Sequence, residues 1–559
     1  MLKRSRCDTH GDFPPPKRIR NEIRSPDRLS SLSDELLLHI LSFLPIPTLN
    51  TCQRLSRRFY ALAADSELWK RQYYSRWVWP RARRLPNARR SSLSRRKFVY
   101  SPKVSTWLGH SHLAEGENVT NWKRQYRLRH NWSKGVCRVT EVELPQASVS
   151  PFLAKLCAGI LFTADSRYGL RAWIAKNPTS CVANIPFSGP DKTPCAAPTA
   201  LTAAESQHRT TIEVTVGFQD GRFSVYDFDH RTSLLCLRSS HDGSTEGSVI
   251  AMASSSPYLL MVSQNNVLSL YEMPVTPEGA NKNEQAAEPR LLMSLRADSI
   301  VAPMSLAIRI SASEIISSIV YSFFHLGCGW SLGIQELRLN RDGQQIGSRL
   351  ATTVDSQYGM RHMRTVLPSV ELSGVQNRVA SELSVAPAEP SILHQQPPTS
   401  MSYSHPYLLT SHADNTLTMY IVVSTSESLF VKSGERLWGH TSSVSAVHVS
   451  DRGKAVSVGS FGDEIRIWEL ESALSSSGRR NALRGENSIQ ITPENKRHRK
   501  SGDLDMLSHT VGHAAQVASG DTPNKMGMLR GCVGFDDERV LLFREKGLGT
   551  PWLECYDFT

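Results

Sequence analysis

The chain lacks the short motifs around which common active sites are built. It contains no P-loop, no HExxH and no GxSxG, and no cysteine stands beside a histidine in a recognisable nucleophile elbow. These absences exclude the usual phosphate-cradling, zinc-protease and serine-hydrolase chemistries. We therefore expect a protein that binds other molecules and is not itself an enzyme, and we expect no cofactor.

Cysteine is present, but not in a pattern that builds a framework. The ten cysteines show neither CxxC pairs nor compact spacing, and no secretory signal stands at the N-terminus. We therefore expect a reducing compartment, the nucleus and/or the cytoplasm, and no metal site.

Long hydrophobic runs are scarce as well. The one candidate for a membrane span is residues 315–334, in which His325 is the only ionisable group of note. The serines, glycines and clustered β-branched residues of this run favour a pair of buried strands instead. We expect no contact with a membrane.

Negative charge is scarce at the N-terminal end. Residues 1–134 contain 28 Lys and Arg against 10 Asp and Glu, and the remainder contains 37 against 42, so the net charge of +13 is entirely N-terminal. Residues 1–28, rich in Pro, Arg and Lys, predict a disordered basic tail. Two basic runs resemble nuclear import signals, and a solvated charge run is the open alternative for each. The import candidates are Lys17, Arg18, Arg20, Lys496, Arg497, Arg499 and Lys500.

Residues 29–78 predict four short helices with more apolar surface than they can bury. Ser33 is a candidate N-cap for a first helix whose apolar run, residues 36–44, fills more of the circumference than one buried stripe requires. Pro45 ends this helix, and Thr48 can cap a second one. Because a domain this small buries too little of its own chain, a partner is implied.

The same stretch resembles an F-box, the small helical module that attaches a protein to a ubiquitin ligase. The shared features are an acidic first helix, an Ile followed by Leu-Pro, a leucine-led second helix, a basic pair before an aromatic residue and a closing Leu-Trp. They correspond here to Ile40, Leu44, Pro45, Leu49, Arg57, Arg58, Phe59, Leu68 and Trp69. The chain departs from the family at Leu32 and Ser33, where Leu-Pro is usual. An ordinary helical hairpin inside a larger core is the alternative.

The resemblance implies a surface that binds a Skp-type adaptor protein. The contact residues that we predict for this surface are Leu32, Leu36, Ile40, Leu41, Leu44, Pro45, Leu49 and Leu55.

A basic helical linker is predicted over residues 79–134. The sequence WKRQY at 69–73 recurs at 122–126, and each copy is followed by a further tryptophan, Trp77 and Trp132. The second copy resembles the stretch that joins F-box to propeller in F-box/WD-repeat proteins. Interleaved arginines and aromatic residues can also bind nucleic acid, but without a recognised binding module we do not expect it.

From residue 135 onward, short alternating strands and turn residues indicate an all-β repeat protein. The clearest unit, residues 437–470, resembles a WD repeat, with His440 near its start and Trp468 in its third strand. The turn aspartate of that family would fall at Gly462. The usual bond between histidine and aspartate is therefore in doubt in this repeat.

Weaker copies of this unit follow the same template. One has Asn265 at the turn position, residues 160–173 fit loosely, and residues 291–340 supply strands for a blade without a motif. Together they predict seven blades, because a closed ring removes exposed edge strands. The turn aspartates, each six residues before an aromatic residue, are Asp220, Asp414 and Asp537.

The propeller, residues 135–559, needs one further strand to close. Residues 136–144 alternate correctly to complete the last blade beside the C-terminal residues. Polar stretches rich in Ser, Pro, Asn, Gln and Glu near 274–290, 371–402 and 471–527 predict disordered insertions.

The expected fold class is α+β multidomain: a helical F-box and helical linker, followed by an all-β WD-repeat-like propeller of seven blades. As the resemblance implies, the F-box binds a Skp-type adaptor, and through it a cullin and a RING protein, while the propeller binds one or more protein substrates for ubiquitination. The alternatives are an F-box scaffold that never joins a cullin and a basic propeller associated with nucleic acid. Some family members read degrons with arginines at the places of Ser445 and Phe461, so the chemistry of the substrate stays open.

Overall fold

The structure is a computed structural model of the whole chain. It describes residues 28–29, 31–78, 121–143, 153–176, 181–187, 196–206, 211–242, 247–274, 288–296, 301–311, 313–357, 392–432, 434–450, 453–460, 464–470, 488–493, 529–546 and 550–559. Contacts divide these into two compact units, one with residues 28–78 and 121–126 and the other with residues 127–559.

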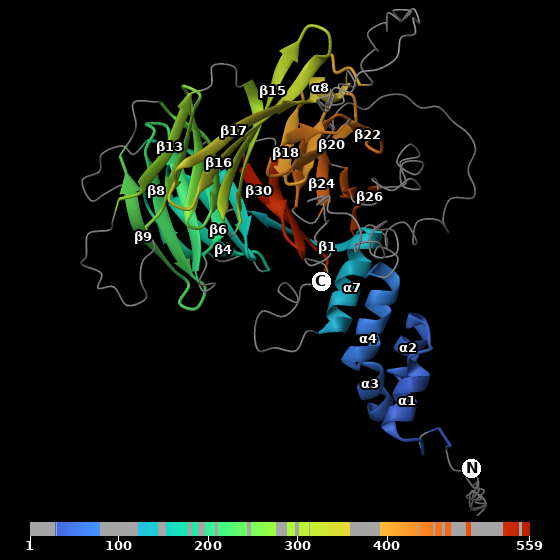
Figure 1. Cartoon of the computed structure of the whole chain (residues 1–559). Helices are drawn as coiled ribbons and strands as arrows, with labels where there is room; N and C mark the ends of the chain where they lie inside the picture. The colour runs from blue at the N-terminus through green and yellow to red at the C-terminus, as the bar shows by residue number, and fades with distance from the viewer. Residues whose placement is uncertain are drawn as a thin grey trace, which may run out of the picture. The chain divides into compact units, whose positions relative to one another are not determined.

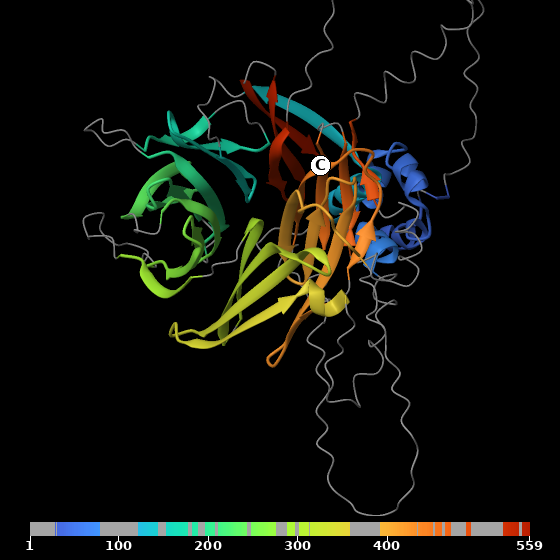
Figure 2. The same ribbon diagram turned by 90° about the horizontal axis from the view of Figure 1, so that it is seen from above.

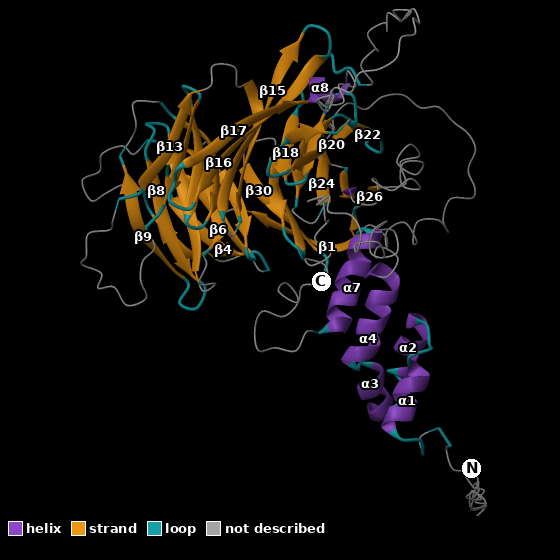
Figure 3. Cartoon of the chain, in the orientation of Figure 1, coloured by secondary structure: helices purple, strands orange, loops and turns teal. Residues whose placement is uncertain are grey.

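The first unit is a small all-helical module (Figures 1 and 3). Most of its apolar core is Leu37, Leu41, Leu49, Phe59 and Leu68, which are contributed by all four short helices. Its helices are α1 (Asp34–Leu41), α2 (Ile46–Cys52), α3 (Arg57–Ala63), α4 (Ser66–Tyr73), the π-helical turn η1 (Tyr74–Val78) and the first residues of α7 (Trp122–Lys134).

Local side-chain bonds explain where these helices begin. Asp65 caps α4 by accepting hydrogen bonds from the amides of Glu67 and Leu68, at 2.9 and 3.4 Å. Ser33 holds the N-cap position of α1, but its side chain makes no capping bond. The prediction that Thr48 caps the second helix is wrong: α2 already begins at Ile46, because a proline in the first turn loses no helical hydrogen bond.

The repeated sequence WKRQY packs against itself. The copy on α4 meets the copy on α7, and each tryptophan contacts the tyrosine of the other copy, with ring centroids 5.5 Å apart in both pairs. Each lysine also lies over the other tryptophan, Lys123 at 5.7 Å and Lys70 at 6.0 Å from the ring centroid. The two ring pairs are Trp69 with Tyr126 and Tyr73 with Trp122. The internal repeat is therefore a reciprocal packing motif.

The described strands of the second unit form seven sheets, which Figure 2 shows arranged around a common centre. The predicted seven-bladed propeller is thus confirmed. Blades one to three are β2 (Leu153–Cys157), β3 (Ile160–Asp165), β4 (Gly169–Ile174) and β5 (Cys181–Ile185); β6 (Pro198–Glu205), β7 (Thr211–Phe218), β8 (Phe223–Asp229) and β9 (Leu234–His241); β10 (Val249–Ser255), β11 (Tyr258–Ser263), β12 (Val267–Glu272) and β13 (Arg290–Arg296).

The remaining blades follow the same antiparallel order. They are β14 (Val301–Ile310), β15 (Glu314–His325), β16 (Gly329–Asn340) and β17 (Gln345–Thr352), followed by the short helix α8 (Thr353–Gln357); β18 (Ser400–Ser404), β19 (Tyr407–Ser411), β20 (Leu417–Ser424), β21 (Leu429–Val431) and β22 (Glu435–Leu437); β23 (Val444–Val449), β24 (Lys454–Gly459), β25 (Ile465–Glu469) and β26 (Ser488–Gln490); and β28 (Leu529–Phe535), β29 (Arg539–Lys546) and β30 (Thr550–Asp557) with β1 (Val136–Glu143).

The ring closes through strands from the two ends of the propeller. β1 pairs antiparallel with β30, from Arg138 opposite Asp557 to Glu143 opposite Trp552. The short strand β27 (Thr492–Pro493) lies parallel on the other edge of β1. The expected closing strand is therefore present.

Hydroxyl groups join the innermost strands of neighbouring blades. These strands, the first of each blade, contact one another in sequence, and β28 returns to β2. The Ser305 hydroxyl accepts from the Tyr403 amide at 3.1 Å, and the Ser402 hydroxyl accepts from the Val449 amide at 3.0 Å. Such bonds fix the register between blades that share no backbone ladder.

Several boundaries differ from those expected. Residues 488–493, placed in an insertion, form β26 and β27, because Ile489 and Ile491 alternate with polar residues and pack into the last two blades. Residues 392–402, the end of another predicted insertion, are also ordered parts of the propeller. Ile392 and His394 are buried, and β18 begins at Ser400. The rest of that insertion up to residue 391 lies outside the described residues, as do residues 1–27 and 79–120 of the predicted tail and linker.

The apolar run 315–334 is the hairpin of β15 and β16, paired from Glu314 opposite Asn340 to His325 opposite Gly329. The preference for paired buried strands is confirmed. None of the described helices has the length and apolar character needed to cross a membrane.

Candidate functional site

Helix α1 has two apolar faces, and only one of them is buried. Leu37 and Leu41 are 1% and 2% exposed and lie in the helical core. Leu36, Ile40 and Phe43 are 54%, 41% and 67% exposed. Leu36 and Ile40, four residues apart, share one face of α1, and Phe43 follows in the turn directly after the helix. We call these three residues the exposed stripe. An unpartnered apolar stripe on so small a module indicates a binding surface.

The eight predicted contact residues divide between this surface and the core. Leu41 and Leu49 are buried inside the module and cannot touch a partner directly, so we reassign both to the core. Leu32 and Leu44 are partly buried and pack against that core. The exposed members are Leu36, Ile40, Pro45 and Leu55. In a helix that is apolar on most sides, the sequence does not tell which side faces inward.

Phe43 is a large exposed apolar residue that the predicted contact set does not contain. It stands three residues after Ile40, so its spacing was a usable signal. Its ring lies 5.0 Å from that of His39 and 5.6 Å from the guanidinium carbon of Arg71. These neighbours support the ring from the side and leave most of it open to solvent.

Arg58, from the basic pair before the aromatic residue, fixes the start of α1. Its Nε donates to the Asp34 carboxylate at 2.9 Å, and its Nη2 donates to the Leu32 carbonyl at 2.7 Å. The ion pair is exposed and adds little energy. Its role is geometric, because it ties α3 to the first turn of the helix that carries the exposed stripe.

In the sixth blade, the predicted residues His440 and Trp468 form a buried hydrogen-bond network with Ser457. Ser457 Oγ lies 2.6 Å from His440 Nε2 and accepts from Trp468 Nε1 at 2.7 Å. Burial lowers the pKa of His440 to about 4, so this imidazole is neutral. His440 Nδ1 lies 3.3 Å from Glu464 Oε2, without full hydrogen-bond geometry. His440 and Trp468 are thus joined through Ser457 in a buried hydrogen-bond network within the blade.

Glu464 takes the place in which the family pattern put an aspartate. Its carboxylate accepts from the Thr441 amide at 2.8 Å and from Arg466 Nε at 2.6 Å. Burial opposes the charge, but these bonds lower the pKa of Glu464 below its ordinary value. The family pattern places an aspartate at position 462. Here a glutamate stands two residues later, and its longer side chain brings Oε2 to 3.3 Å from His440 Nδ1.

The predicted turn aspartates serve their own turns. Asp220 accepts from the Arg222 amide at 3.1 Å, and Asp414 accepts from the Thr416 amide at 3.2 Å and from its hydroxyl at 2.6 Å. The assignment of Asp537 needs correction. Its neighbour Asp536 accepts both turn amides, from Glu538 and Arg539, each at 2.7 Å.

Asp537 acts through its backbone. Its carbonyl accepts from Trp132 Nε1 at 2.7 Å, and the Trp132 ring stacks on Phe558 with centroids 4.0 Å apart. Trp132 therefore anchors the C-terminal half of α7 to the last blade.

The predicted import signals cannot be placed in the structure. The import candidates, residues 17–20 and 496–500, lie outside the described residues. Among the residues that the structure describes, no group of three or more His, Cys, Asp or Glu could hold a metal ion.

Two family models match the chain. The one described as F-box-like matches residues 29–75, and the one described as F-box protein pof12 beta-propeller matches residues 137–559. A relative, F-box protein pof12 of Schizosaccharomyces pombe, is 21% identical over 469 residues, which covers 81% of this chain and 87% of the relative.

Solved structures give weaker matches. The β-propeller domain of Myceliophteria thermophila Cps50 (Swd1) is 10% identical, with 75% of this chain and 100% of that chain covered at a TM-score of 0.37. Saccharomyces cerevisiae Sqt1 is 11% identical, with 75% and 99% covered at a TM-score of 0.36.

Proposed function

Because the chain belongs to the F-box protein pof12 beta-propeller family and joins that propeller to an F-box-like domain, we propose that it is the substrate-recognition subunit of an SCF-type ubiquitin ligase. Its architecture is that of an F-box protein of the substrate-receptor type, and such receptors are not themselves catalysts. The exposed stripe would bind a Skp-type adaptor, which in turn would bind a cullin and its RING protein. The propeller would bind the protein substrate.

The observation that carries this proposal is the exposed stripe itself. Three large apolar side chains are exposed, two on α1 and one in the turn after it, while the other face of α1 is already buried in the module. Full burial of one such side chain contributes roughly 1.5–3 kcal/mol, so an adaptor that covers all three gains substantial affinity. Receptor and adaptor would then raise the effective concentration of substrate near the conjugating enzyme.

Co-purification of the full-length chain from cells tests the proposal. We expect Ile40→Asp to remove adaptor, cullin and RING protein together, because a charge in an apolar interface is left without a partner. Leu234→Asp is the matched control: Leu234 is equally apolar and 60% exposed, but lies on β9 of the propeller. Undiminished adaptor binding by Ile40→Asp would refute the F-box assignment.

The same experiment separates the alternatives. Recovery of adaptor without cullin would indicate a scaffold that is not part of a ligase. Recovery of nucleic-acid proteins in place of the adaptor would indicate the basic-propeller alternative. We also propose that the protein acts in the nucleus and/or the cytoplasm, on the basis of its two basic runs.

A further inference from the structure

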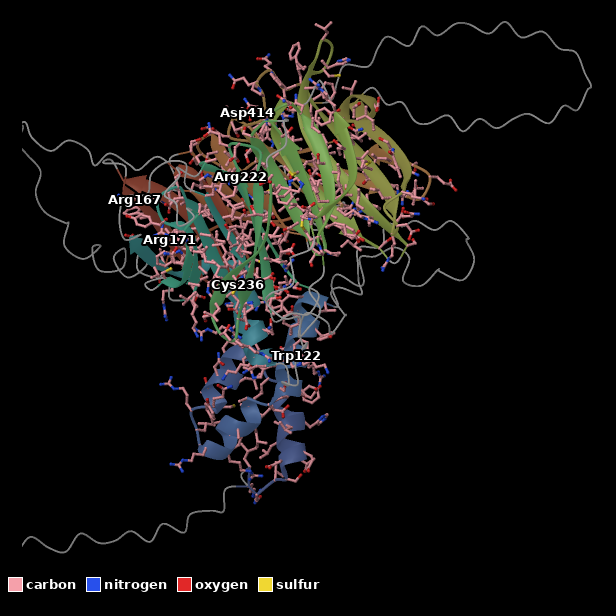
Figure 4. All side chains as sticks on the ribbon, turned by 90° about the vertical axis from the view of Figure 1, so that its left-hand side faces the viewer. Trp122, Arg167, Arg171, Arg222, Cys236 and Asp414 are labelled. Atoms are coloured by element: carbon pink, nitrogen blue, oxygen red, sulfur yellow. The ribbon has the colours of Figure 1, made fainter. Side chains whose placement is uncertain are left out.

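A pocket of about 460 Å³ opens on the first blade, beside β4 and β5. Tyr168, Arg171 and Trp173 form one wall, and Cys181 and Asn184 of β5 form part of the other. Figure 4 labels Arg171 on this blade, near Arg167 of the preceding turn. Nothing in the predicted blade architecture assigns a role to this pocket.

Arg171 is held rigidly at the pocket wall. Its Nη2 donates to Asp165 Oδ2 at 2.8 Å, and Asp165 is completely buried. The other oxygen of Asp165 accepts from the amides of Arg167 and Tyr168, at 2.9 and 2.7 Å. The acid cannot turn away, so it fixes the plane of the guanidinium.

Two aromatic rings complete this arrangement. The guanidinium carbon of Arg171 lies 4.8 Å from the Tyr168 ring centroid and 5.4 Å from that of Trp173. Trp173 is itself fixed, because its Nε1 donates to the Thr163 hydroxyl at 2.9 Å. The wall of the pocket is therefore a pre-organised cation between flat apolar surfaces.

A small part of the Arg171 side chain remains accessible at the pocket. The side chain is 7% exposed and lines the pocket, whereas its Nε is buried and makes no hydrogen bond within the described part of the chain. The turn also adds a second guanidinium, since Arg167 lies 5.4 Å from the Tyr168 ring on an exposed position. The Arg167 and Arg171 guanidinium groups both lie near the Tyr168 ring, and Asp165 is the one acid in residues 165–171, so this turn carries a net positive charge.

We propose that this pocket binds a carboxylate of the protein substrate, carried next to an apolar side chain. A carboxylate matches the guanidinium donors of Arg171 and Arg167, and its apolar neighbour matches the partly exposed Tyr168 ring. The carboxylate comes either from an internal Asp or Glu or from the C-terminus of the substrate. This inference rests on the proposed function as a substrate receptor and names the chemistry that the receptor reads.

Fluorescence polarisation on the purified full-length chain tests the pocket. The probes are three labelled libraries of hexapeptides with random apolar residues: one amidated with a fixed central Glu, one amidated with a fixed central Gln, and one with Gln and a free C-terminal carboxylate. We expect the Glu library, the free-carboxylate library or both to bind about tenfold more tightly than the amidated Gln library, because hydrogen bonds to a charged group are the strong ones. The stronger of the two names the source of the carboxylate.

Two variants locate the binding. Cys181→Trp fills the pocket from an exposed position of β5 and leaves Arg171 and Asp165 untouched, so we expect it to abolish the preference. Cys236→Trp is the matched control, an exposed cysteine on β9 of the second blade (Figure 4), and should keep it. Arg171→Lys retains the charge but loses the fork, and should weaken the preference about tenfold.

Equal binding of all three libraries by the wild-type chain would overturn the proposal, and so would a preference that survives Cys181→Trp. Adaptor co-purification is measured on the same preparations. Loss of the adaptor with the peptide preference intact would count against the proposed ligase role alone. A chain that holds the adaptor but shows no peptide preference would count against the pocket alone.

Discussion

Ser457 is the residue on which the sixth blade depends most. Its hydroxyl meets both His440 Nε2 and Trp468 Nε1. The neutral tautomer with its proton on Nδ1 directs that proton toward Glu464 and leaves Nε2 to accept from Ser457. One small side chain thus satisfies two buried rings.

We expect Ser457→Ala to destabilise the propeller by about 3 kcal/mol, because it leaves two buried polar groups without partners. Ser445→Ala is the control, since it removes only one bond, from its hydroxyl to the Val458 carbonyl at 3.2 Å. Its cost should be about 0.5–1 kcal/mol. The denaturation midpoints of the two variants measure the difference, and equal midpoints would refute the shared role of Ser457.

A stacked pair of histidines makes the fifth blade sensitive to acid. The rings of His394 and His412 lie 3.9 Å apart and nearly parallel, and both are buried. Burial lowers the pKa of His394 to about 4 and that of His412 to about 3 from an ordinary 6.5, with Arg436 adding to the effect and Asp414 opposing it. Both imidazoles are therefore neutral in the folded chain at neutral pH.

The stability of the propeller should consequently fall as the pH is lowered from 6.5 to 4. In this range the unfolded chain binds protons at these histidines and the folded chain does not, so the full contribution is present only above 6.5. Melting temperatures between pH 7 and pH 4.5 measure this slope. The double variant His394→Asn with His412→Asn should show a shallower slope, and an unchanged slope would contradict the prediction.

At the scale of elements, β30 is the strand that closes the ring. It lies between β1 and β29, so its loss separates both from each other. Its register with β1 runs over six residue pairs from Arg138 to Glu143. The last strand to be reached along the chain is therefore central to its sheet.

We expect removal of residues 550–559 to unfold the whole propeller, since an open ring exposes the faces of its first and last blades to water. Circular dichroism melting and limited proteolysis measure the loss. Deletion of residues 501–510, which the sequence predicts to belong to an insertion, is the control of equal length and should leave the melt unchanged. A truncated chain with native β-sheet content and melting would show that the ring is not one cooperative unit.

Elements were predictable where a pattern repeats. The WD-repeat template, together with the need for a closed ring, predicts seven blades, and the apolar run 315–334 is correctly predicted to be paired strands. The short strand of residues 488–490 was missed, because three residues within a polar stretch carry too weak an alternation. Pairing with β25 defines it, and pairing lies outside its own sequence.

Side chains within those elements were predictable only in part. Helix α1 is apolar on two faces, so the pattern could not tell that Leu41 turns inward while Ile40 turns outward. The acids that accept the turn amides do not stand at the positions that the template gives. Glu464 lies two residues after its template position and Asp536 lies one residue before, because the turns differ in length from the template. The Arg171 pocket had no sequence signal, since its walls come from two strands and a turn.

At the scale of the whole molecule, the net positive charge is confined to the N-terminal part of the chain. Residues 1–134 hold the entire basic excess, and the propeller is mildly acidic. A basic segment outside the helical core can govern transport without touching the blades. The first candidate import signal lies in this basic part, and the second, residues 496–500, lies in a predicted insertion of the propeller.

We expect joint replacement of Lys17, Arg18 and Arg20 and of the basic residues at 496–500 by alanine to move the protein from nucleus to cytoplasm, with adaptor binding unchanged. Either replacement alone should give a partial shift, since the two runs can substitute for each other. Imaging of a fluorescent fusion measures this. Nuclear accumulation that survives the joint replacement, in a chain of 62.3 kDa, would refute import by these runs.

The closure of the ring by β1 and β30 also sets an order of events on the ribosome. β1 is synthesised before the first blade, and its antiparallel partner is the last strand to emerge. With about 400 residues between them and synthesis at 5–20 residues per second, β1 waits roughly 20–80 s for that partner. Helices α1–α4 depend on neighbours that emerge much earlier. The exposed stripe is therefore available on the nascent chain before a finished ring exists to hold any substrate.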